Sequence, residues 1–172
     1  MRTASRGVGG HQRPYSGFSN EWLTPREILS ALGPFDLDPC APITRPWSMA
    51  RKHYTIEDNG LSKPWDGRVW LNPPYGPLTG MWLERLADHG NGVALIFART
   101  ETVFFHRQVW DRADDLFFLE GRLHFCWPDG TRAKFNAGAP SVLVAYGREN
   151  GDRFIAAHLD GLKGKHVELR RV

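Results

Sequence analysis

The alternation of hydrophobic and polar residues predicts helices and strands that follow each other along most of the chain. Apolar residues at 28, 29 and 32 predict a helix, and Leu78, Trp82 and Leu86, each one turn apart, predict another. A third helix fits "ETVFFHRQVWDRA". Short apolar runs predict five strands, in chain order "FDLDP", "VWL", "GVALIFA", "DLFFLEG" and "PSVLVAYG", of which we expect "PSVLVAYG" to be the last. This alternation favours an α/β protein with a parallel or mixed sheet.

The first predicted helix, "TPREILSALG", carries signals at both ends. Thr24 is placed to cap it, Pro25 suits the first turn and Glu27 completes a capping box. Gly33 is expected to end it.

Length and composition indicate one globular domain. The chain has 172 residues, of which 41% are hydrophobic. Residues 1–17 are rich in Gly and Arg, and we expect them to be disordered, with a single domain over residues 18–172. The sequence shows no apolar run of membrane-spanning length and no secretion signal, so we expect a cytoplasmic protein with free thiols at Cys40 and Cys126.

The charge is small but unevenly distributed. The net charge is +3, yet residues 1–20 contain three arginines and no acid. The last stretch, "GLKGKHVELRRV", is also basic, and the sequence pI is about 9.1. Basic ends suit a polyanionic partner, although solvated ends on an ordinary domain explain the charge equally well.

The most distinctive chemistry lies at "LNPPYG", directly after the predicted strand 69–71. Pro73 and Pro74 remove two backbone donors, so the strand must stop and leave Asn72 at its carboxyl end, where open α/β sheets bind ligands. The chain shows no catalytic triad, phosphate-binding loop or metal-ligand motif, and we expect no metal. An amide oxygen, a proline carbonyl and the ring of Tyr75 favour a site that binds a planar group and polarises an amino group.

This stretch resembles the Asp/Asn-Pro-Pro-Tyr/Phe motif of methyltransferases that modify exocyclic amino groups with S-adenosylmethionine. From about Asn20 to Gly147 the chain resembles, more narrowly, the phage-type DNA N-6-adenine methyltransferase family. The other blocks that carry the resemblance are, in order, "EWLTP", "FDLDPCA", "EDNGLSKPW" and "FARTET". The family implies a Rossmann-like mixed sheet flanked by helices. Only about 20 residues separate Asp38 from Asp58, so we expect this sheet to be abbreviated on the side of the cofactor ribose.

The resemblance implies methyl transfer from S-adenosylmethionine to the N6 amino group of adenine in double-stranded DNA, by an enzyme of a phage or prophage acting in a bacterial host cell. Within the motif 72–75, the side-chain oxygen of Asn72 and the carbonyl of Pro73 would accept the two amino hydrogens. Pro74 completes the motif, and Tyr75 would stack on the flipped base.

The resemblance also implies contacts to the cofactor from "FDLDPCA". Asp38, or the neighbouring Asp36, would accept a hydrogen bond from the α-amino group, and the backbone at Pro39, Cys40 and Ala41 would pass close by. The glycines usual in this block of the wider superfamily are missing, which makes a close backbone approach harder.

Two further blocks supply cofactor contacts on the same basis. Thr24 and Pro25 would line the amino-acid end and Trp22 would cover it, a role compatible with capping the helix. Asp58 would accept from the amino group of the cofactor adenine, but it is equally an ordinary turn residue. Glu57 is a candidate ribose ligand.

The long connection from Arg122 to Phe135 is aromatic and basic, and two interpretations stay open for it. It is either a surface hairpin with "PDG" at its tip or a DNA-contacting loop. In the second case the contacts to phosphates would come from Arg122, Arg132 and Lys134, and those to the base from Phe125 or Trp127.

Three other functions remain compatible with the sequence. The acceptor is alternatively an adenine of RNA or a glutamine of a protein, or the chain is a DNA-binding protein that has lost catalysis. We expect no obligate protein partner, no membrane association and only a short or relaxed target sequence, because a domain of this size leaves little room for a recognition module.

Overall fold

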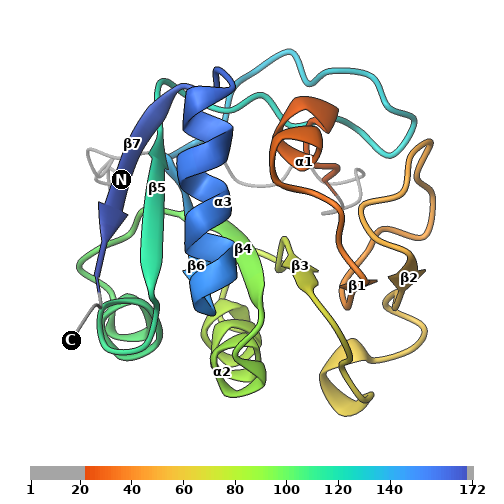
Figure 1. The fold of residues 1–172 in the computed structure, drawn as a ribbon. Helices are drawn as coiled ribbons and strands as arrows, with labels where there is room; N and C mark the ends of the chain where they lie inside the picture. Colours follow the sequence, from red (N-terminus) through yellow and green to blue (C-terminus); the bar gives the residue numbers. More distant parts are fainter. Residues whose placement is uncertain (1–21, 170–172) are drawn as a thin grey trace, which may run out of the picture.

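The computed structural model describes residues 22–169, so the segment 1–17 that we expect to be disordered lies outside the described residues. Within residues 22–169, seven strands form one sheet in the order β2-β1-β3-β4-β6-β5-β7 (Figure 1). The strands are β1 (Leu37–Asp38), β2 (Lys52–His53), β3 (Val69–Leu71), β4 (Gly92–Phe97), β5 (Asp115–Leu119), β6 (Ser141–Tyr146) and β7 (Gly164–Glu168). The helices are α1 (Arg26–Leu32), α2 (Thr79–His89) and α3 (Arg148–Leu159), with a 3-10 turn η1 (Gly60–Ser62) and a π-helix η2 (Phe105–Trp110).

The sheet is mixed, which confirms the predicted fold class. β2, β1, β3 and β4 run parallel, and β6 is antiparallel to both β4 and β5. β7 pairs antiparallel with the outer side of β5. The carboxyl ends of β1, β3 and β4 therefore lie along one edge of the sheet, which we call the carboxyl edge.

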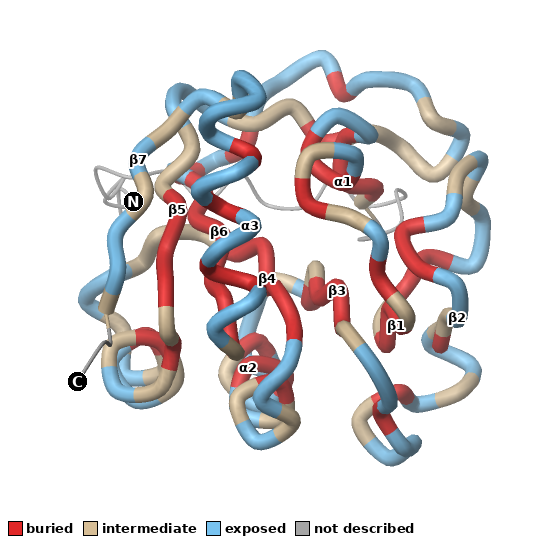
Figure 2. The backbone as a smooth tube through the Cα atoms, viewed as in Figure 1, coloured by how far each residue is buried: buried red, intermediate tan, exposed pale blue. Residues whose placement is uncertain are grey.

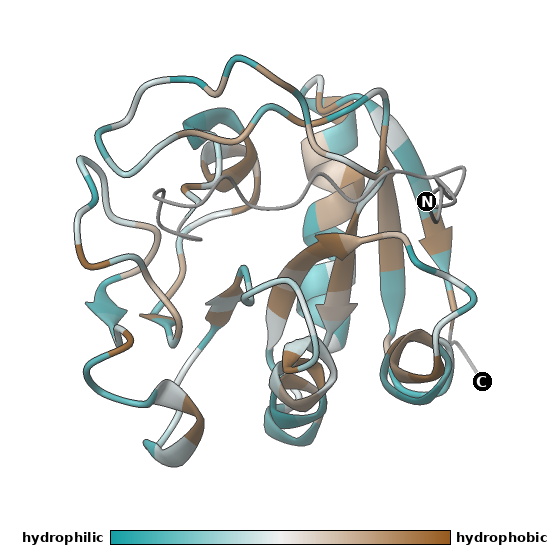
Figure 3. Cartoon of the chain, turned by 180° about the vertical axis from the view of Figure 1, so that it is seen from behind, coloured by the Kyte–Doolittle hydropathy of each residue, from teal (hydrophilic) through white to brown (hydrophobic). Residues whose placement is uncertain are grey.

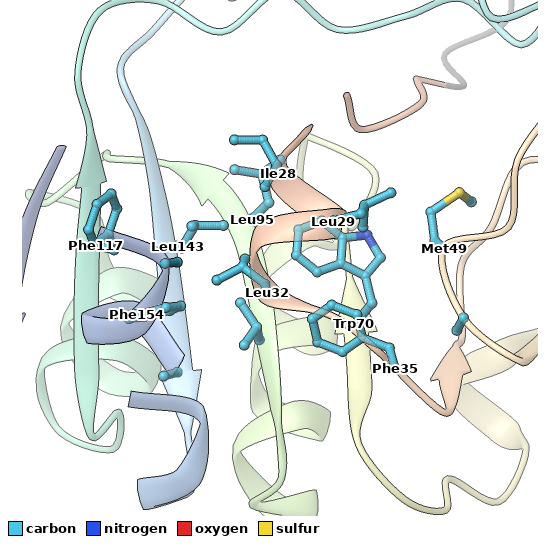
Figure 4. Close-up of a cluster of buried hydrophobic side chains, with 14 of the residues drawn as sticks. Ile28, Leu29, Leu32, Phe35, Met49, Trp70, Leu95, Phe117, Leu143 and Phe154 are labelled. Atoms are coloured by element: carbon cyan, nitrogen blue, oxygen red, sulfur yellow. The ribbon is translucent and has the colours of Figure 1, made fainter. Parts of the chain in front are cut away.

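Helices cover both faces of the sheet. On one face, α1 and α3 pack against the sheet through residues such as Leu32 and Phe154, which meet Trp70 and Leu143 (Figure 4). On the other face, α2 and η2 contribute residues such as Leu86 and Phe105 to a second buried cluster. Viewed from that side, hydrophobic residues concentrate on the strands (Figure 3). The middle strands are buried between the two layers, whereas the segment between β5 and β6 is mostly exposed (Figure 2).

The chain does not end its sheet at "PSVLVAYG", as the sequence pattern predicted. This segment forms β6, but α3 and the edge strand β7 follow it. Gly151 weakens the helix signal of α3, because glycine has a low helix propensity. Packing requires a glycine at this position, since a Cβ atom there would lie 1.9 Å from Asp115 Oδ2. β7 lacks an apolar face because it is a partly exposed edge strand.

The predicted cap of the first helix is wrong. α1 begins at Arg26, and the position before it is Pro25, so no side chain caps the helix. Thr24 is instead 1% exposed, and its hydroxyl has no hydrogen-bond partner among the described residues. Gly33 does end the helix, as predicted.

The helix predicted over "ETVFFHRQVWDRA" forms with a wider turn than expected. Asp111 N donates to His106 O, a bond that spans five residues, and residues 105–110 are a π-helix. The buried residues Phe105 and Val109 face α2 from this segment. No helix in residues 22–169 has the length and apolar character needed to cross a membrane.

Candidate active site

Asn72 is the first residue after β3, at the carboxyl edge of the sheet. Its Nδ2 donates to the carbonyl oxygen of Trp22 at 3.2 Å. A carbonyl oxygen only accepts, so this contact fixes which end of the amide is nitrogen. The amide oxygen therefore points elsewhere, and lies 3.4 Å from the hydroxyl of Tyr75. Asn72 is thus held with a hydrogen-bond acceptor turned toward the tyrosine.

Tyr75 is fixed by two other aromatic rings. Its ring stacks on Phe97, with centroids 4.1 Å apart and an angle of 14° between the planes, and Phe125 lies 6.2 Å away at a steep angle of 69°. Burial raises the pKa of the Tyr75 hydroxyl above its ordinary value. The hydroxyl therefore stays protonated at neutral pH, where it is a donor to Asn72 and not a base.

The loop after the motif is tied to the start of α2 by one side chain. Thr79 Oγ1 donates to the carbonyl of Pro74 at 2.9 Å and accepts from the backbone N–H of Gly76 at 3.0 Å. Pro73 is buried while Pro74 is exposed. The four residues 72–75 thus form a braced turn whose first and last side chains face each other.

Asp38 ends the neighbouring strand β1 and is 2% exposed. Its Oδ1 accepts a hydrogen bond from the backbone N–H of Cys40 at 3.1 Å, and burial raises the pKa of its carboxyl group to about 7. Cys40 Sγ in turn donates to the backbone carbonyl of Asn72 at 3.2 Å. This thiol joins the predicted cofactor block to the predicted catalytic block.

Asp36, the alternative to Asp38, lies at the amino end of β1, away from the carboxyl edge. Its carboxylate accepts from the backbone N–H of Arg68 at 2.7 Å and pairs with Arg51. These two partners hold the pKa of Asp36 below its ordinary value. Asp38 is therefore the carboxyl group available at the carboxyl edge.

The residues that follow Asp38 are built into the edge of the sheet. The N–H of Tyr54 donates to the carbonyl of Asp38, and the N–H of Ala41 donates to that of Tyr54, both at 2.8 Å. Pro39 is buried and packs against Gly60, where a Cβ atom would lie 1.9 Å from the Pro39 carbonyl oxygen. Because Gly60 has no side chain, its backbone approaches the Pro39 carbonyl more closely than any other residue would allow.

The amino-terminal segment lies across the site. Leu23 exchanges two backbone hydrogen bonds with Cys126, at 2.9 and 3.0 Å. The rings of Trp22 and Trp127 have centroids 4.4 Å apart. The carbonyl of Thr24 accepts from Trp47 Nε1 at 3.3 Å. Trp22 is therefore held beside Asn72, and the buried residues Thr24 and Pro25 follow it in the same segment.

The predicted surface hairpin exists between β5 and β6, and we call it the hairpin, residues 123–137. Its arms pair through Cys126 and Arg132. Phe125 is 6% exposed and belongs to the core, while Trp127 stacks on Trp22. Arg132 and Lys134 are exposed. Arg122, just before the hairpin, donates from Nη1 to the carbonyl of Ala137 at 3.3 Å.

Asp58 has the turn role that the sequence also allowed. Its Oδ2 accepts from the backbone N–H of Thr55 at 2.8 Å and from the Thr55 hydroxyl at 3.2 Å. The backbone N–H of Thr55 holds the pKa of Asp58 below its ordinary value. Glu57 beside it is exposed. Contact with the cofactor stays a prediction for both acids.

The model of the DNA N-6-adenine-methyltransferase (Dam) family matches residues 16–160, a span that includes every element from α1 to β6. The chain belongs to this family. The match supports methylation of adenine N6 in DNA as the general activity. Searches of curated proteins and of solved structures returned no match to the chain.

A hollow elsewhere on the molecule does not coincide with the motif residues. A hollow of about 380 Å³ lies at the opposite edge, where β1, β2 and β3 begin. It is lined by Asp36, Leu37, Arg51, Lys52, Asp66 and Gly67. We assign the site to the carboxyl edge, because ligands of open α/β sheets bind there and because the motif residues meet there.

The sequence interpretation missed Phe97, the aromatic support of Tyr75. Phe97 is the last residue of β4, and the strand it ends was predicted. Its signal was an aromatic residue at the carboxyl end of a buried strand next to the motif strand. A stacking role needs the pairing of β3 with β4, which the sequence did not provide.

Proposed function

We propose that the chain transfers a methyl group from S-adenosylmethionine to the N6 amino group of adenine in double-stranded DNA, as a phage or prophage enzyme acting in the bacterial cytoplasm. One observation carries the proposal. The amide of Asn72 is oriented by the Trp22 carbonyl, so its oxygen is turned toward Tyr75 at the carboxyl edge. An acceptor so fixed beside an aromatic ring suits an amino group on a planar base.

The acceptor chemistry follows from this geometry. The adenine amino nitrogen is a poor nucleophile because its lone pair is conjugated with the ring. Hydrogen bonds from its two hydrogens to Asn72 Oδ1 and to the Pro73 carbonyl favour a more tetrahedral nitrogen with a free lone pair. S-Adenosylmethionine, when bound, supplies a methyl group already activated by its sulfonium. No strong base is required, which accords with a Tyr75 hydroxyl that keeps its proton.

The residues at the end of β1 fit a cofactor that carries a positive charge. Asp38 is a buried carboxyl group that forms no ion pair with a described residue, and a cationic amino group would stabilise its ionised form. The unpartnered Thr24 hydroxyl is a second polar group that a ligand can satisfy. We assign the α-amino and carboxylate end of the cofactor to Asp38, Thr24 and Pro25.

The remaining cofactor contacts are proposed on the same footing. The backbone at Pro39, Cys40 and Ala41 lies beside this end, Trp22 covers it, and Asp58 accepts from the adenine of the cofactor. Gly60 packs directly against the backbone of Pro39. This glycine therefore permits a close backbone approach at the first block, although the glycines usual in that block are missing.

The DNA side of the site is formed by Tyr75 and the hairpin. Phe97 covers one face of the Tyr75 ring, so a flipped adenine stacks on the opposite face. Phosphate contacts come from the cationic residues Arg122, Arg132 and Lys134, which lie on or beside the hairpin. The buried Phe125 supports the Tyr75 ring, and Trp127 supports Trp22.

The test is incubation of the full chain with methyl-labelled S-adenosylmethionine and, in parallel, unmodified duplex DNA, single-stranded DNA, RNA and protein. Nucleoside mass analysis is expected to show N6-methyladenine in the duplex. Label found chiefly in RNA or in glutamine would replace the proposed acceptor. Binding of DNA with no transfer to any acceptor would favour a protein that has lost catalysis. Mapping of the modified adenines then tests whether the target sequence is short or relaxed.

A further inference from the structure

The regular pairing of the hairpin arms is interrupted by a bulge in the returning arm. Cys126 pairs with Arg132, and the N–H of Ala133 donates to the carbonyl of Phe125 at 2.8 Å, in the same register. Continued pairing would place residue 135 opposite Leu123. The N–H of Ala137 occupies that position instead, bonded to the Leu123 carbonyl at 2.6 Å. Two extra residues are therefore accommodated in the returning arm, and we call residues 134–136 the bulge.

The bulge presents an aromatic ring to solvent among cationic side chains. Phe135 is 66% exposed, in contrast to Phe125, which is 6% exposed on the opposite arm. The ammonium of Lys134 lies 5.6 Å from the centre of the Phe135 ring. Arg132 and Asn136 are exposed on either side. An exposed apolar ring flanked by cationic side chains suits a partner that combines charged phosphates with stacked bases.

The bulge starts next to the wall of the site. Ala133 is bonded to Phe125, and the ring of Phe125 lies 6.2 Å from that of Tyr75. Phe135 is two residues beyond Ala133, a span of roughly 7 Å in extended chain. DNA that offers a base to Tyr75 therefore passes within reach of the bulge.

We propose that Phe135 enters the duplex beside the target adenine and occupies the stacking place that the flipped base leaves, while Lys134 and Arg132 contact the flanking phosphates. The proposal rests on the proposed function, since it concerns how the same site receives its base from duplex DNA. Apolar side chains inserted between bases stabilise an unstacked duplex, and flipping is easiest where pairing is already absent. Phe135 is thus a DNA-contacting residue that assists base flipping and takes no part in methyl transfer.

The experiment compares Phe135→Ala with the wild-type full chain on two substrates. One is a duplex around an adenine shown to be methylated, and the other is the same duplex with an abasic site opposite that adenine. Loss of one stacking contact is expected to lower kcat/KM on the paired duplex by roughly tenfold to a hundredfold. On the abasic-site duplex the loss is expected to be no more than about threefold, because little pairing energy remains to be overcome. Phe135→Leu, which keeps an apolar side chain, is expected to recover most of the activity on the paired duplex.

The control is Leu159→Ala, a truncation of another exposed apolar residue at the end of α3 that is expected to leave both rates unchanged. A fluorescent 2-aminopurine at the target position gives a second readout, with a smaller increase on binding Phe135→Ala than on binding the wild type. Equal rates for Phe135→Ala and wild type on the paired duplex would overturn the proposal, as would equal losses on both substrates. Absence of any adenine in duplex DNA that the wild type methylates would instead overturn the proposed function.

Discussion

Each half of the sheet contains one buried aspartate, and the two carboxyl groups differ in their hydrogen-bond partners. Asp115 begins β5 in the half formed by β4, β6, β5 and β7, and it is 2% exposed. Its Oδ1 lies 2.7 Å from Nε2 of His166 on β7, so the carboxylate has a side-chain hydrogen-bond partner. Asp38 on β1 is equally buried, but among residues 22–169 its carboxyl group accepts only from a backbone N–H, and burial raises its pKa. Asp115 thus has a side-chain partner within the fold, whereas Asp38 is suited to bind a cationic ligand.

The strands themselves show the same contrast. β4 and β6 pair over all their residues, from Gly92 with Tyr146 to Phe97 with Ser141. β1 and β2 have two residues each, and hydrogen bonds between loops continue where the strands end. The half that supports Tyr75 is therefore fixed by regular pairing, and the half assigned to the cofactor depends on loops and polar contacts. Four predictions test this difference.

Asn72→Ala has the largest expected effect. Removal of the oriented acceptor is expected to lower kcat on the order of a thousandfold, while cofactor affinity stays within a few fold, since the oxygen of Asn72 is assigned to the amino group of the base. Radiolabel transfer measures the first quantity and calorimetry the second. Asn72→Asp, which keeps an oxygen acceptor but loses the bond to Trp22, should retain intermediate activity. Normal turnover in Asn72→Ala would remove this residue from the mechanism.

Asp38→Asn is expected to change the pH dependence of stability. The folded carboxyl group keeps its proton to about pH 7, whereas the unfolded one releases it near 3.8, so wild-type stability from this group is complete below pH 4 and is lost as pH rises to 7. At pH 8, Asp38→Asn should therefore exceed the wild type in the free energy of unfolding by on the order of a few kcal/mol, and this advantage should vanish near pH 4.

Chemical denaturation at several pH values measures this difference. Asp115→Asn is the matched control, and it should be less stable than the wild type because a neutral amide weakens the buried hydrogen bond to His166. An Asp38→Asn variant that is less stable at pH 8 would show that Asp38 already has its charge satisfied by the fold.

The same Asp38→Asn variant is expected to bind S-adenosylmethionine about tenfold to a hundredfold more weakly at pH 8, because a charge-assisted hydrogen bond is lost. For the wild type, affinity should increase with pH up to about 7 and then level off, since binding a cationic group requires the ionised carboxylate. Titration calorimetry at several pH values tests both statements. An affinity that does not change with pH or with the substitution would assign the cofactor amino group to another residue.

Cys40→Ala has the smallest expected effect, because it removes one hydrogen bond between the loops that follow β1 and β3. Loss of the thiol contact to the Asn72 carbonyl is expected to lower kcat by roughly fivefold, with the KM for DNA unchanged. Cys40→Ser keeps a donor and should recover most of that loss, and Cys126→Ala is the control for a thiol outside this contact. Equal activity of the alanine and serine variants would show that the hydrogen bond does not position Asn72.

Much of the site could be predicted because its signals are local. The strand 69–71 and the residue that ends it were read from an apolar run followed by two prolines, and the structure places Asn72 as expected. The cap at Thr24 was also read from local signals and was wrong, because tertiary packing buries that hydroxyl and leaves Pro25 before the helix. Local signals therefore predict well where a strand or helix ends. They predict side-chain partners poorly, because distant segments also compete for those side chains.

By itself, the sequence determined the α/β class and the end of β3 at Asn72, because propensity, hydrophobic period and proline act within a few residues. Only the tertiary structure decided that Cys40 bonds to Asn72, that Trp22 orients the Asn72 amide and that Phe97 supports Tyr75. These contacts join positions that are 32, 50 and 22 residues apart, where pairing depends on the order of strands and on which faces they bury. No local pattern encodes that order, so chemistry that was visible one residue at a time became a site only when the sheet brought its strand ends together.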